Sequence, residues 1–335
     1  METEIVNLTP FVPLSFESID AELNHFGVLV IRGTFKILNN APLALSSHQD
    51  TMVLEDEYYG DPKRSSMRRD SGLTPYKPRT DVLIEATAYA PRGSEQESWT
   101  ASVKAGTLEK TFVVTGPRSW SSRFGMPRLG EIAPIAKLPI RYEQAFGGTS
   151  SDGQRFAENP VGIGFETRIG RLPVAAPQLL PLNARDPVFG QPLPVIGLGP
   201  IPPSWQQRLR WAGTYDEAWR QTKAPYLPSD FSFAFYNVAS TGMSFAGFAE
   251  GDESFQLVNL SEERDLRFTL PNVKLLALIH FADGRTIPGP IQLDTIELEI
   301  EAKTAFLQWR MLFPAQIPTR AIEVRMAAPE SLIIL

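Results

Sequence analysis

Apolar and polar side chains alternate between residues 26 and 37, where the sequence reads FGVLVIRGTFKI. One side of this stretch is apolar and the other polar: Leu29, Ile31, Phe35 and Ile37 against Arg32, Thr34 and Lys36. A period of two is typical of a strand with one face toward a core. We therefore predict a half-buried β-strand here.

Seven further segments have alternating or β-branched sequences, and most are bounded by Gly, Pro, Asn or Asp. They span residues 81–89, 98–104, 110–115, 254–259, 266–270, 273–281 and 295–301. In the last segment, isoleucine and leucine alternate with Glu297, Glu299 and Glu301, so we expect a solvated glutamate face. The pattern predicts a mainly β fold, with antiparallel sheets in a two-lobed, β-sandwich-like architecture.

Proline and capping residues divide the chain. Nine prolines lie between Pro173 and Pro203, which predicts an ordered surface excursion or linker, with a segment for a proline-binding partner as the alternative. Ser204 with Gln207, and Thr214 with Glu217, are spaced as capping boxes and predict short helices around 204–222. The predicted organisation is an N-terminal β lobe (1–165), the proline-rich excursion (166–203) and a C-terminal lobe (204–335).

Composition narrows the function classes. The 335 residues carry a net charge of −6 with no basic tail, which argues against nucleic-acid binding. The chain has no cysteine and three widely spaced histidines, so thiol chemistry is excluded and neither a metal site nor a cofactor is expected. The N-terminus does not resemble a signal peptide, and the longest apolar run is ten residues, 273–282. We expect a cytoplasmic protein that does not insert into membranes.

No catalytic residue is identified, whereas several polar and aromatic segments suggest a binding surface. The locally basic segment 55–82 contains Arg64, Arg68 and Arg69, which could pair with a partner or with neighbouring carboxylates of the chain itself. Trp211, Tyr215 and Trp219 recur at intervals of four, a spacing more typical of core packing than of a ligand platform. The candidate partner-binding residues are Tyr58, Tyr59, Arg64, Arg68, Arg69, Tyr142, Glu143, Trp211 and Trp219.

Ten motifs, in this order, carry a resemblance to a known family. They are LTPF at Leu8, DEYYGDP at Asp56, RSSMR at Arg64, PYKPRTDVLIEATAYAP at Pro75, TGPRSW at Thr115, PIRYEQAFGG at Pro139, ENPVGIGF at Glu158, WAGTYDEAW at Trp211, PSDF at Pro228 and LQWR at Leu307. The chain resembles the bacterial domain-of-unknown-function family numbered 2169, from near its N-terminus to about Arg310.

This resemblance implies a type VI secretion adaptor or chaperone. Such a protein would bind a toxic effector in the producing cell and assist its loading onto the spike, through the effector's PAAR-repeat region or the VgrG trimer. The alternative from another class is a hydrolase that uses Asp56, Glu57 and Glu143, brought together by folding. A third interpretation makes the proline-rich excursion itself a spacer or docking strand.

Overall fold

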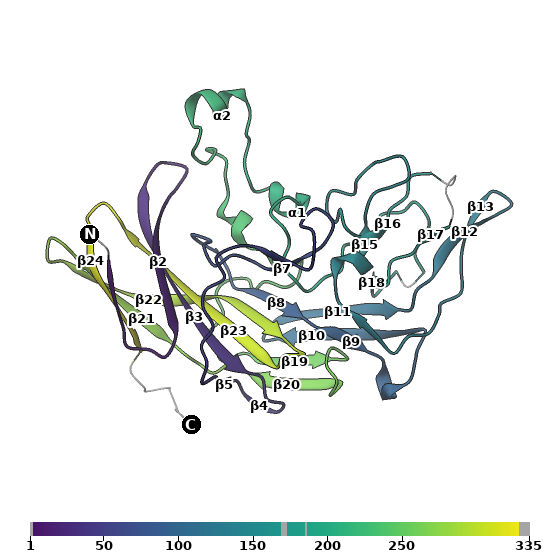
Figure 1. Cartoon of the computed structure of the whole chain (residues 1–335), viewed down its shortest axis with the longest axis horizontal. Helices are drawn as coiled ribbons and strands as arrows, with labels where there is room; N and C mark the ends of the chain where they lie inside the picture. Colours follow the sequence, from purple (N-terminus) through teal and green to yellow (C-terminus); the bar gives the residue numbers. More distant parts are fainter. Residues whose placement is uncertain (1–2, 169–172, 185, 328–335) are drawn as a thin grey trace.

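The computed structural model describes residues 3–168, 173–184 and 186–327 and is mainly β, as predicted. Two large sheets dominate this part of the chain (Figure 1). A nine-stranded sheet has the order β1 (Glu4–Asn7), β24 (Thr319–Met326), β21 (Leu275–Phe281), β22 (Thr286–Glu299), β23 (Thr304–Pro314), β3 (His25–Lys36) and β2 (Val12–Ile19), with β5 (Ala44–Leu45) beside β3 and β8 (Asp81–Glu85) beside β22.

The second large sheet has six strands, and smaller pairings surround it. Its order is β18 (Leu179–Pro181), β11 (Leu108–Thr115), β10 (Ser98–Ala105), β19 (Ser254–Val258), β20 (Asp265–Thr269) and β4 (Ala41–Pro42). The smaller sheets pair β12 (Ser119–Arg123) with β13 (Met126–Leu129) and β17 (Val174–Ala175), β9 (Thr87–Tyr89) with β14 (Lys137–Pro139), β15 (Phe146–Gly147) with β16 (Ile163–Gly164), and β6 (Glu57–Tyr58) with β7 (Met67–Arg69).

The two lobes expected from the sequence are joined through both large sheets. Strand β3 pairs with β23 along eleven residues of each strand, and β8 pairs with β22. In the other sheet β10 pairs with β19. One apolar core contains side chains from both sides of the proline-rich excursion, such as Ile31 and Leu307. The boundaries at residues 165 and 203 stay a prediction, but the strands on either side of them share sheets and core.

Strand β3 is buried on both faces, so the prediction of a half-buried strand was wrong. Leu29 and Ile31 face the main core, as the alternation indicated. On the opposite face Arg32 and Thr34 are also almost fully buried. The reason is that the chain after β5 covers this face, where the backbone amide of Asp50 donates to the Thr34 hydroxyl at 2.9 Å.

The glutamate face of β22 is likewise covered, which corrects the expectation of a solvated face. The strand begins at Thr286, earlier than predicted, and ends at Glu299. Glu297 is 8% exposed, and the side chain of Glu299 is mostly buried, because arginines from the segment before β8 pair with both. Glu301 lies beyond the strand and accepts the Thr87 amide proton instead.

The predicted short helices are present, but their caps differ from the prediction. They are α1 (Gln206–Leu209) and α2 (Glu217–Thr222). Helix α1 begins after Trp205 without a side-chain cap, so Ser204 does not form the expected capping box. Helix α2 is capped by Asp216, whose carboxylate accepts the Trp219 amide proton at 2.8 Å. Within the described ranges, no helix is long and apolar enough to cross a membrane.

Because both halves of the chain share one core, we predict that shortening a core side chain in either half lowers the stability of the whole body. Ile31→Ala in β3 and Leu307→Ala in β23 should each cost about 2–5 kcal/mol of unfolding free energy. Both should shift the same urea transition, followed by tryptophan fluorescence. Leu45→Ala, at a half-exposed position, is the control and should change stability by about 0.5 kcal/mol or less. Two separate transitions, each moved by one variant only, would contradict a shared core.

Candidate functional site

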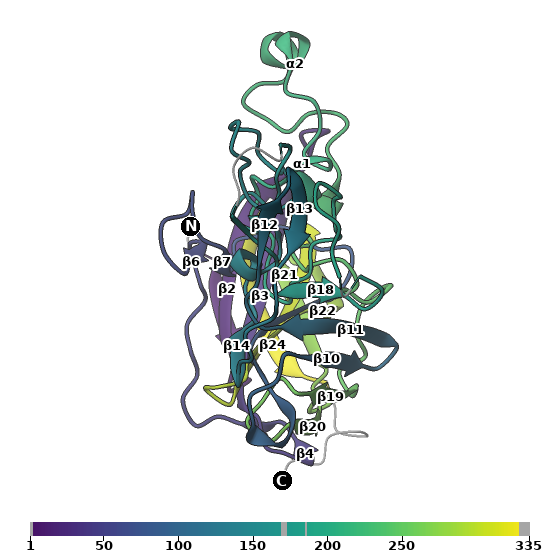
Figure 2. The same cartoon turned by 90° about the vertical axis from the view of Figure 1, so that its right-hand side faces the viewer.

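Residues 211–236 leave the body of the protein and form an ordered projection with α2 at its tip (Figures 1 and 2). At its foot the Asp230 carboxylate accepts hydrogen bonds from the amide and the hydroxyl of Thr214, at 2.9 and 2.7 Å. Gly213 has φ = +80°, and a Cβ there would lie 2.8 Å from the Asp230 carboxylate. Lys223 donates to the carbonyl of Ala21 at 2.9 Å, which ties the projection to the β2–β3 loop. These contacts fix its position on the body.

The projection is unusually rich in aromatic side chains that are not buried. Eight of its 26 residues are aromatic, and each is half-buried or exposed: Trp211, Tyr215, Trp219, Tyr226, Phe231, Phe233, Phe235 and Tyr236. Trp211, Tyr215 and Tyr226 are 41%, 52% and 43% exposed. Clustered exposed aromatics mark interaction surfaces, because such side chains bury large apolar areas on binding. The projection is therefore the candidate functional site.

The rings of the projection support one another. Tyr215 and Trp219 meet edge to face with centroids 4.7 Å apart, and the indole N–H of Trp219 donates to the carbonyl of Tyr226 at 2.8 Å. At the foot, Phe231 contacts Phe233, which in turn lies edge-on to Tyr76 of the body, 5.3 Å between centroids. The aromatic surface is thus held in a defined arrangement and does not consist of independent side chains.

Arg208 connects the foot of the projection to the interior. Its guanidinium lies 4.7 Å from the centre of the Phe235 ring and donates to the carbonyls of Phe235 and Ile201, both at 2.9 Å. The side chain is almost completely buried and lies 3.9 Å from the carboxylate of Asp70. A buried cation between an aromatic ring and a carboxylate anchors the projection strongly.

A buried charge network, composed of Asp70, Lys77, Asp81, Arg208, Asp294 and Arg310, lies below the projection. The Lys77 ammonium is 3.3 Å from Asp81 and 3.6 Å from Asp70. Burial by itself lowers the pKa of Lys77, but the attraction of Asp81 and Asp70 outweighs it and raises that pKa. Burial raises the pKa of Asp70, against the opposing effect of Lys77 and Arg208. The network keeps charged groups inside only because they are mutually paired.

Arg68 and Arg69 form a second set of ion pairs over the outer face of the nine-stranded sheet. Arg68 pairs with Glu85 at 3.0 Å and with Glu299 at 3.3 Å. Arg69 pairs with Glu297 at 3.2 Å and also bonds to Glu299. These contacts commit both guanidiniums to carboxylates of the chain itself, which is the internal alternative left open by the sequence.

The remaining predicted residues lie in separate places. Tyr142 is buried, and its hydroxyl donates to the carbonyl of Gly199 at 2.7 Å. Glu143 accepts the amide and hydroxyl protons of Ser66, at 2.8 and 2.6 Å. Tyr59 is half-buried under the Arg141 guanidinium, 3.9 Å from its ring centre, and burial raises its pKa.

Of the nine predicted residues, Trp211 and Trp219 belong to the projection, and the half-buried Tyr58 and the exposed Arg64 lie in the segment before β8. The prediction that Trp211, Tyr215 and Trp219 pack in the core was wrong, because none of the three is buried. Sequence reasoning also missed the rings of the projection's second half, from Tyr226 to Tyr236. The signal that could have found them is the density of aromatics between residues 211 and 236.

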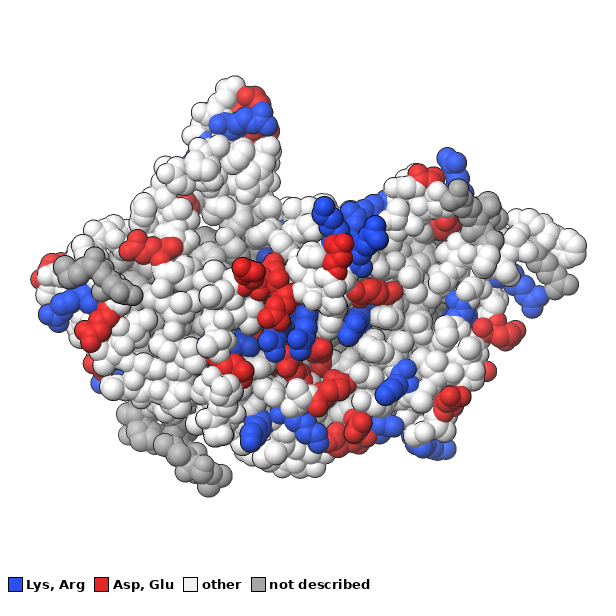
Figure 3. Space-filling view, viewed as in Figure 1, with Lys and Arg blue, Asp and Glu red and all other residues white. Residues whose placement is uncertain are grey.

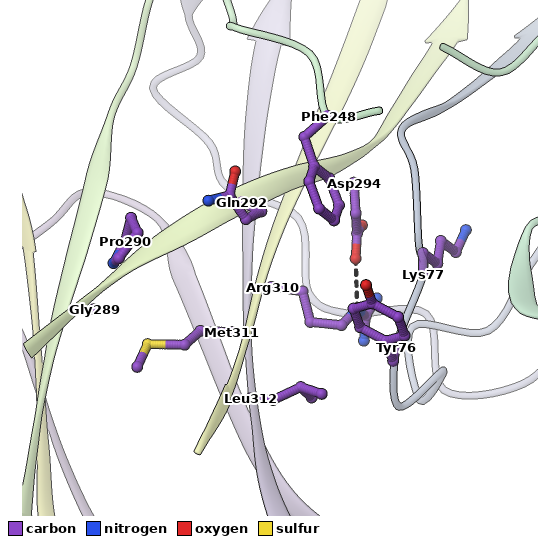
Figure 4. A pocket seen from close by; sticks show the side chains of 10 residues that line it. All are labelled: Tyr76, Lys77, Phe248, Gly289, Pro290, Gln292, Asp294, Arg310, Met311 and Leu312. Carbon is purple, nitrogen blue, oxygen red and sulfur yellow. Dashed lines mark hydrogen bonds and ion pairs between the residues drawn. The ribbon is translucent and has the colours of Figure 1, made fainter. Parts of the chain in front are cut away.

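A cavity of about 310 Å³ lies beside the projection's foot (Figure 4). Its lining is Tyr76, Lys77, Phe248, Gly289, Pro290, Gln292, Asp294, Arg310, Met311 and Leu312. Arg310 and Asp294 are paired at 2.5 Å, and Arg310 also donates to the carbonyl of Thr74. Lys77 pairs with Asp70 and Asp81, so each charged group of the lining has an ionic partner. The rest of the lining is apolar except for Tyr76 and Gln292. Such a cavity suits an apolar side chain better than a reacting polar group.

The three carboxylates of the hydrolase hypothesis have different partners. Asp56 accepts the Ser71 amide proton at 3.0 Å, Glu57 lies 3.8 Å from Arg69, and Glu143 is held by Ser66 as described above. No group of three His, Asp or Glu side chains that could hold a metal ion occurs in the described part of the chain. The hydrolase hypothesis stays a prediction.

We predict that removing one charge from the buried network destabilises the protein strongly. Asp81 is fully buried and accepts from Lys77, from the Val238 amide and from Ser244, so Asp81→Asn leaves the Lys77 ammonium poorly compensated. The expected loss is about 3–5 kcal/mol of unfolding free energy, measured by urea denaturation. Glu109→Gln, which breaks the exposed pair with Lys104, is the control and should cost at most about 1 kcal/mol. Equal, small losses in both variants would show that the buried pairing is not required.

Comparison with known proteins gives a family match over most of the chain. The matching model is described as an uncharacterized protein conserved in bacteria (DUF2169), and it aligns with residues 23–310. The searches of curated proteins and of solved structures find no significant match. The aligned range includes the projection, the buried charge network, the whole six-stranded sheet, and the nine-stranded sheet except β1, β2, β24 and the last residues of β23. The chain therefore belongs to the bacterial family DUF2169.

Proposed function

We propose that this protein is an adaptor that binds a partner protein through non-covalent contacts made by the projection. The observation that carries the proposal is the set of eight half-buried or exposed aromatic side chains on one ordered element that stands away from the body. Tyrosine and tryptophan dominate the energy of many protein interfaces, since they bury large areas with few rotatable bonds.

The order of the projection favours binding. Rings that already pack against each other, as Tyr215 and Trp219 do, lose little side-chain freedom when a partner covers them. The hydrogen bonds of Thr214 to Asp230 and of Lys223 to Ala21 limit movement of the element as a whole. A preorganised surface of this kind can hold a partner without covalent chemistry.

The type VI secretion role is our specific version of this proposal. In it the protein acts in the cytoplasm of the producing cell, binds a toxic effector and assists its loading onto the VgrG and PAAR spike. It rests on the resemblance of the ten sequence motifs, nine of which lie within the range of the family match. The segment WAGTYDEAW, one of these motifs, supplies the exposed rings of Trp211 and Tyr215.

We predict that truncating the exposed rings of the projection abolishes partner capture without unfolding the protein. The test is a pull-down of the tagged protein from its native cells under secretion-competent conditions, with mass spectrometry of the retained proteins. A combined Trp211→Ala, Tyr215→Ala and Tyr226→Ala variant should lower recovery of the partner about tenfold or more. The reason is that truncating an aromatic residue at the centre of an interface can cost about 2 kcal/mol of binding free energy.

The matched control is a combined Leu45→Ala and Leu182→Ala variant, which removes comparably exposed apolar side chains elsewhere. It should retain the partner at the wild-type level. Recovery of a spike-associated toxin would support the secretion role. Unchanged recovery with the projection variant would place the binding surface elsewhere and contradict the proposal.

A further inference from the structure

A groove with a basic lining lies at the foot of the projection, next to α1. Its volume is about 660 Å³, and its lining is Pro62, Lys63, Arg64, Thr149, Arg155, Pro160, Val161, Ser204 and Trp205. Three of these residues are cations and none is a carboxylate. Figure 3 shows Lys and Arg side chains gathered beside the foot of the projection. This local excess of positive charge contrasts with the net charge of −6 of the whole chain.

The three cations are exposed and have no ion-pair partner within the described residues. They contrast with Arg68 and Arg69, four and five residues further along, which pair with carboxylates of the chain itself. Arg155 was not recognised in the sequence because it is about 90 residues from Lys63 and Arg64. Folding brings the loops together, and Arg155 donates to the Lys63 carbonyl at 3.2 Å.

The backbone around the groove is ordered. The Asp61 carboxylate accepts the Lys63 amide proton at 2.9 Å, and the Asp61 carbonyl accepts those of Arg64 and Ser65. The opposite wall is a hairpin in which Thr149 and Arg155 form a β-bridge. The floor is Trp205, which packs with Tyr142 and Ile201 in a small apolar core. The charges are therefore presented from fixed positions.

We propose that this groove binds an acidic peptide segment of the partner protein. The inference rests on the proposed adaptor role and adds a second, electrostatic contact surface to it. The groove ends at Ser204 and Trp205, directly before α1, and Trp211 of the projection follows directly after that helix. One partner can therefore contact both surfaces at once.

The chemistry of the groove favours carboxylates on an extended chain over a compact phosphate. Phosphate sites in proteins are usually built from several backbone N–H groups that converge on the anion. Here the amides of Lys63, Arg64 and Ser65 already donate to Asp61, so the positive charge comes from separated side chains alone. Arginine forks bind carboxylates with two parallel hydrogen bonds, and cations on separate loops match carboxylates spaced along a chain better than one compact anion.

We test this proposal with fluorescence anisotropy of a labelled hexaglutamate peptide and the full-length protein. A hexaglutamine peptide is the uncharged control. Wild type should bind hexaglutamate and not hexaglutamine, and binding should weaken as the salt concentration rises from about 0.05 M to about 0.3 M. A Lys63→Gln, Arg64→Gln, Arg155→Gln variant should bind about tenfold more weakly or worse, since three exposed ion pairs are lost.

The matched control variant is Lys36→Gln, Arg128→Gln, Lys137→Gln. It removes the same total charge from exposed cations outside the groove, and its affinity should stay within about twofold of wild type. A single Ser204→Glu substitution, which keeps all cations but places a carboxylate in the groove, should also weaken hexaglutamate binding. Equal affinity losses in both triple variants, or none in either, would overturn the proposal.

Two further outcomes would also contradict the proposal that the groove binds an acidic peptide. Absence of hexaglutamate binding by wild type would overturn this proposal, but it would leave the pull-down result with the projection variants as the independent measure of the adaptor role. Displacement of the peptide by inorganic phosphate at equal concentration would identify a general anion site and overturn the assignment to an acidic peptide.

Discussion

Charge pairing between the segment of residues 46–81 and the outer face of the nine-stranded sheet is the constraint on which the structure depends. Strand β22 places Asp294, Glu297 and Glu299 on a face that the segment covers, and buried carboxylates without partners would each cost several kcal/mol. Arg69 of the segment supplies the cation for Glu297 and Glu299, whereas Asp294 pairs with Arg310 of the neighbouring strand β23. The segment must therefore follow a defined path over the sheet, and this path sets the positions of the loops around it.

The functional proposals follow from this arrangement. Arg68 and Arg69 of this segment form ion pairs with carboxylates of the protein itself. In its turn from Asp61 to Ser65, Lys63 and Arg64 are exposed and line the basic groove. The buried Arg208 links the same network to the Phe235 ring at the foot of the projection. The aromatic surface and the basic groove are thus presented from one rigid base, which favours simultaneous contact with one partner.

The sequence predicts local properties of this protein well and long-range ones poorly. Alternation identified β3 and β22, because a strand's apolar period depends only on neighbouring residues. It could not show that both faces of β3 are buried, since Asp50, which contacts Thr34, and Glu297, which pairs with Arg32, lie elsewhere in the chain. For the same reason the role of Arg68 was undecided, and Arg155 was not connected with Arg64. The exposed Trp211 was misassigned because the spacing of Trp211, Tyr215 and Trp219 suggested one packed helical face, whereas only Trp219 lies in a helix.

In the proposed complex, one partner protein covers both the projection and the basic groove. Amide hydrogen exchange of the protein, alone and with the captured partner, tests this claim most directly. We expect slower exchange in residues 211–236 and in the loops at 61–65 and 149–155, with little change in the hairpin of β12 and β13 at the right-hand end of the molecule in Figure 1. Protection confined to that hairpin, or to the free edge of β2, would contradict the account.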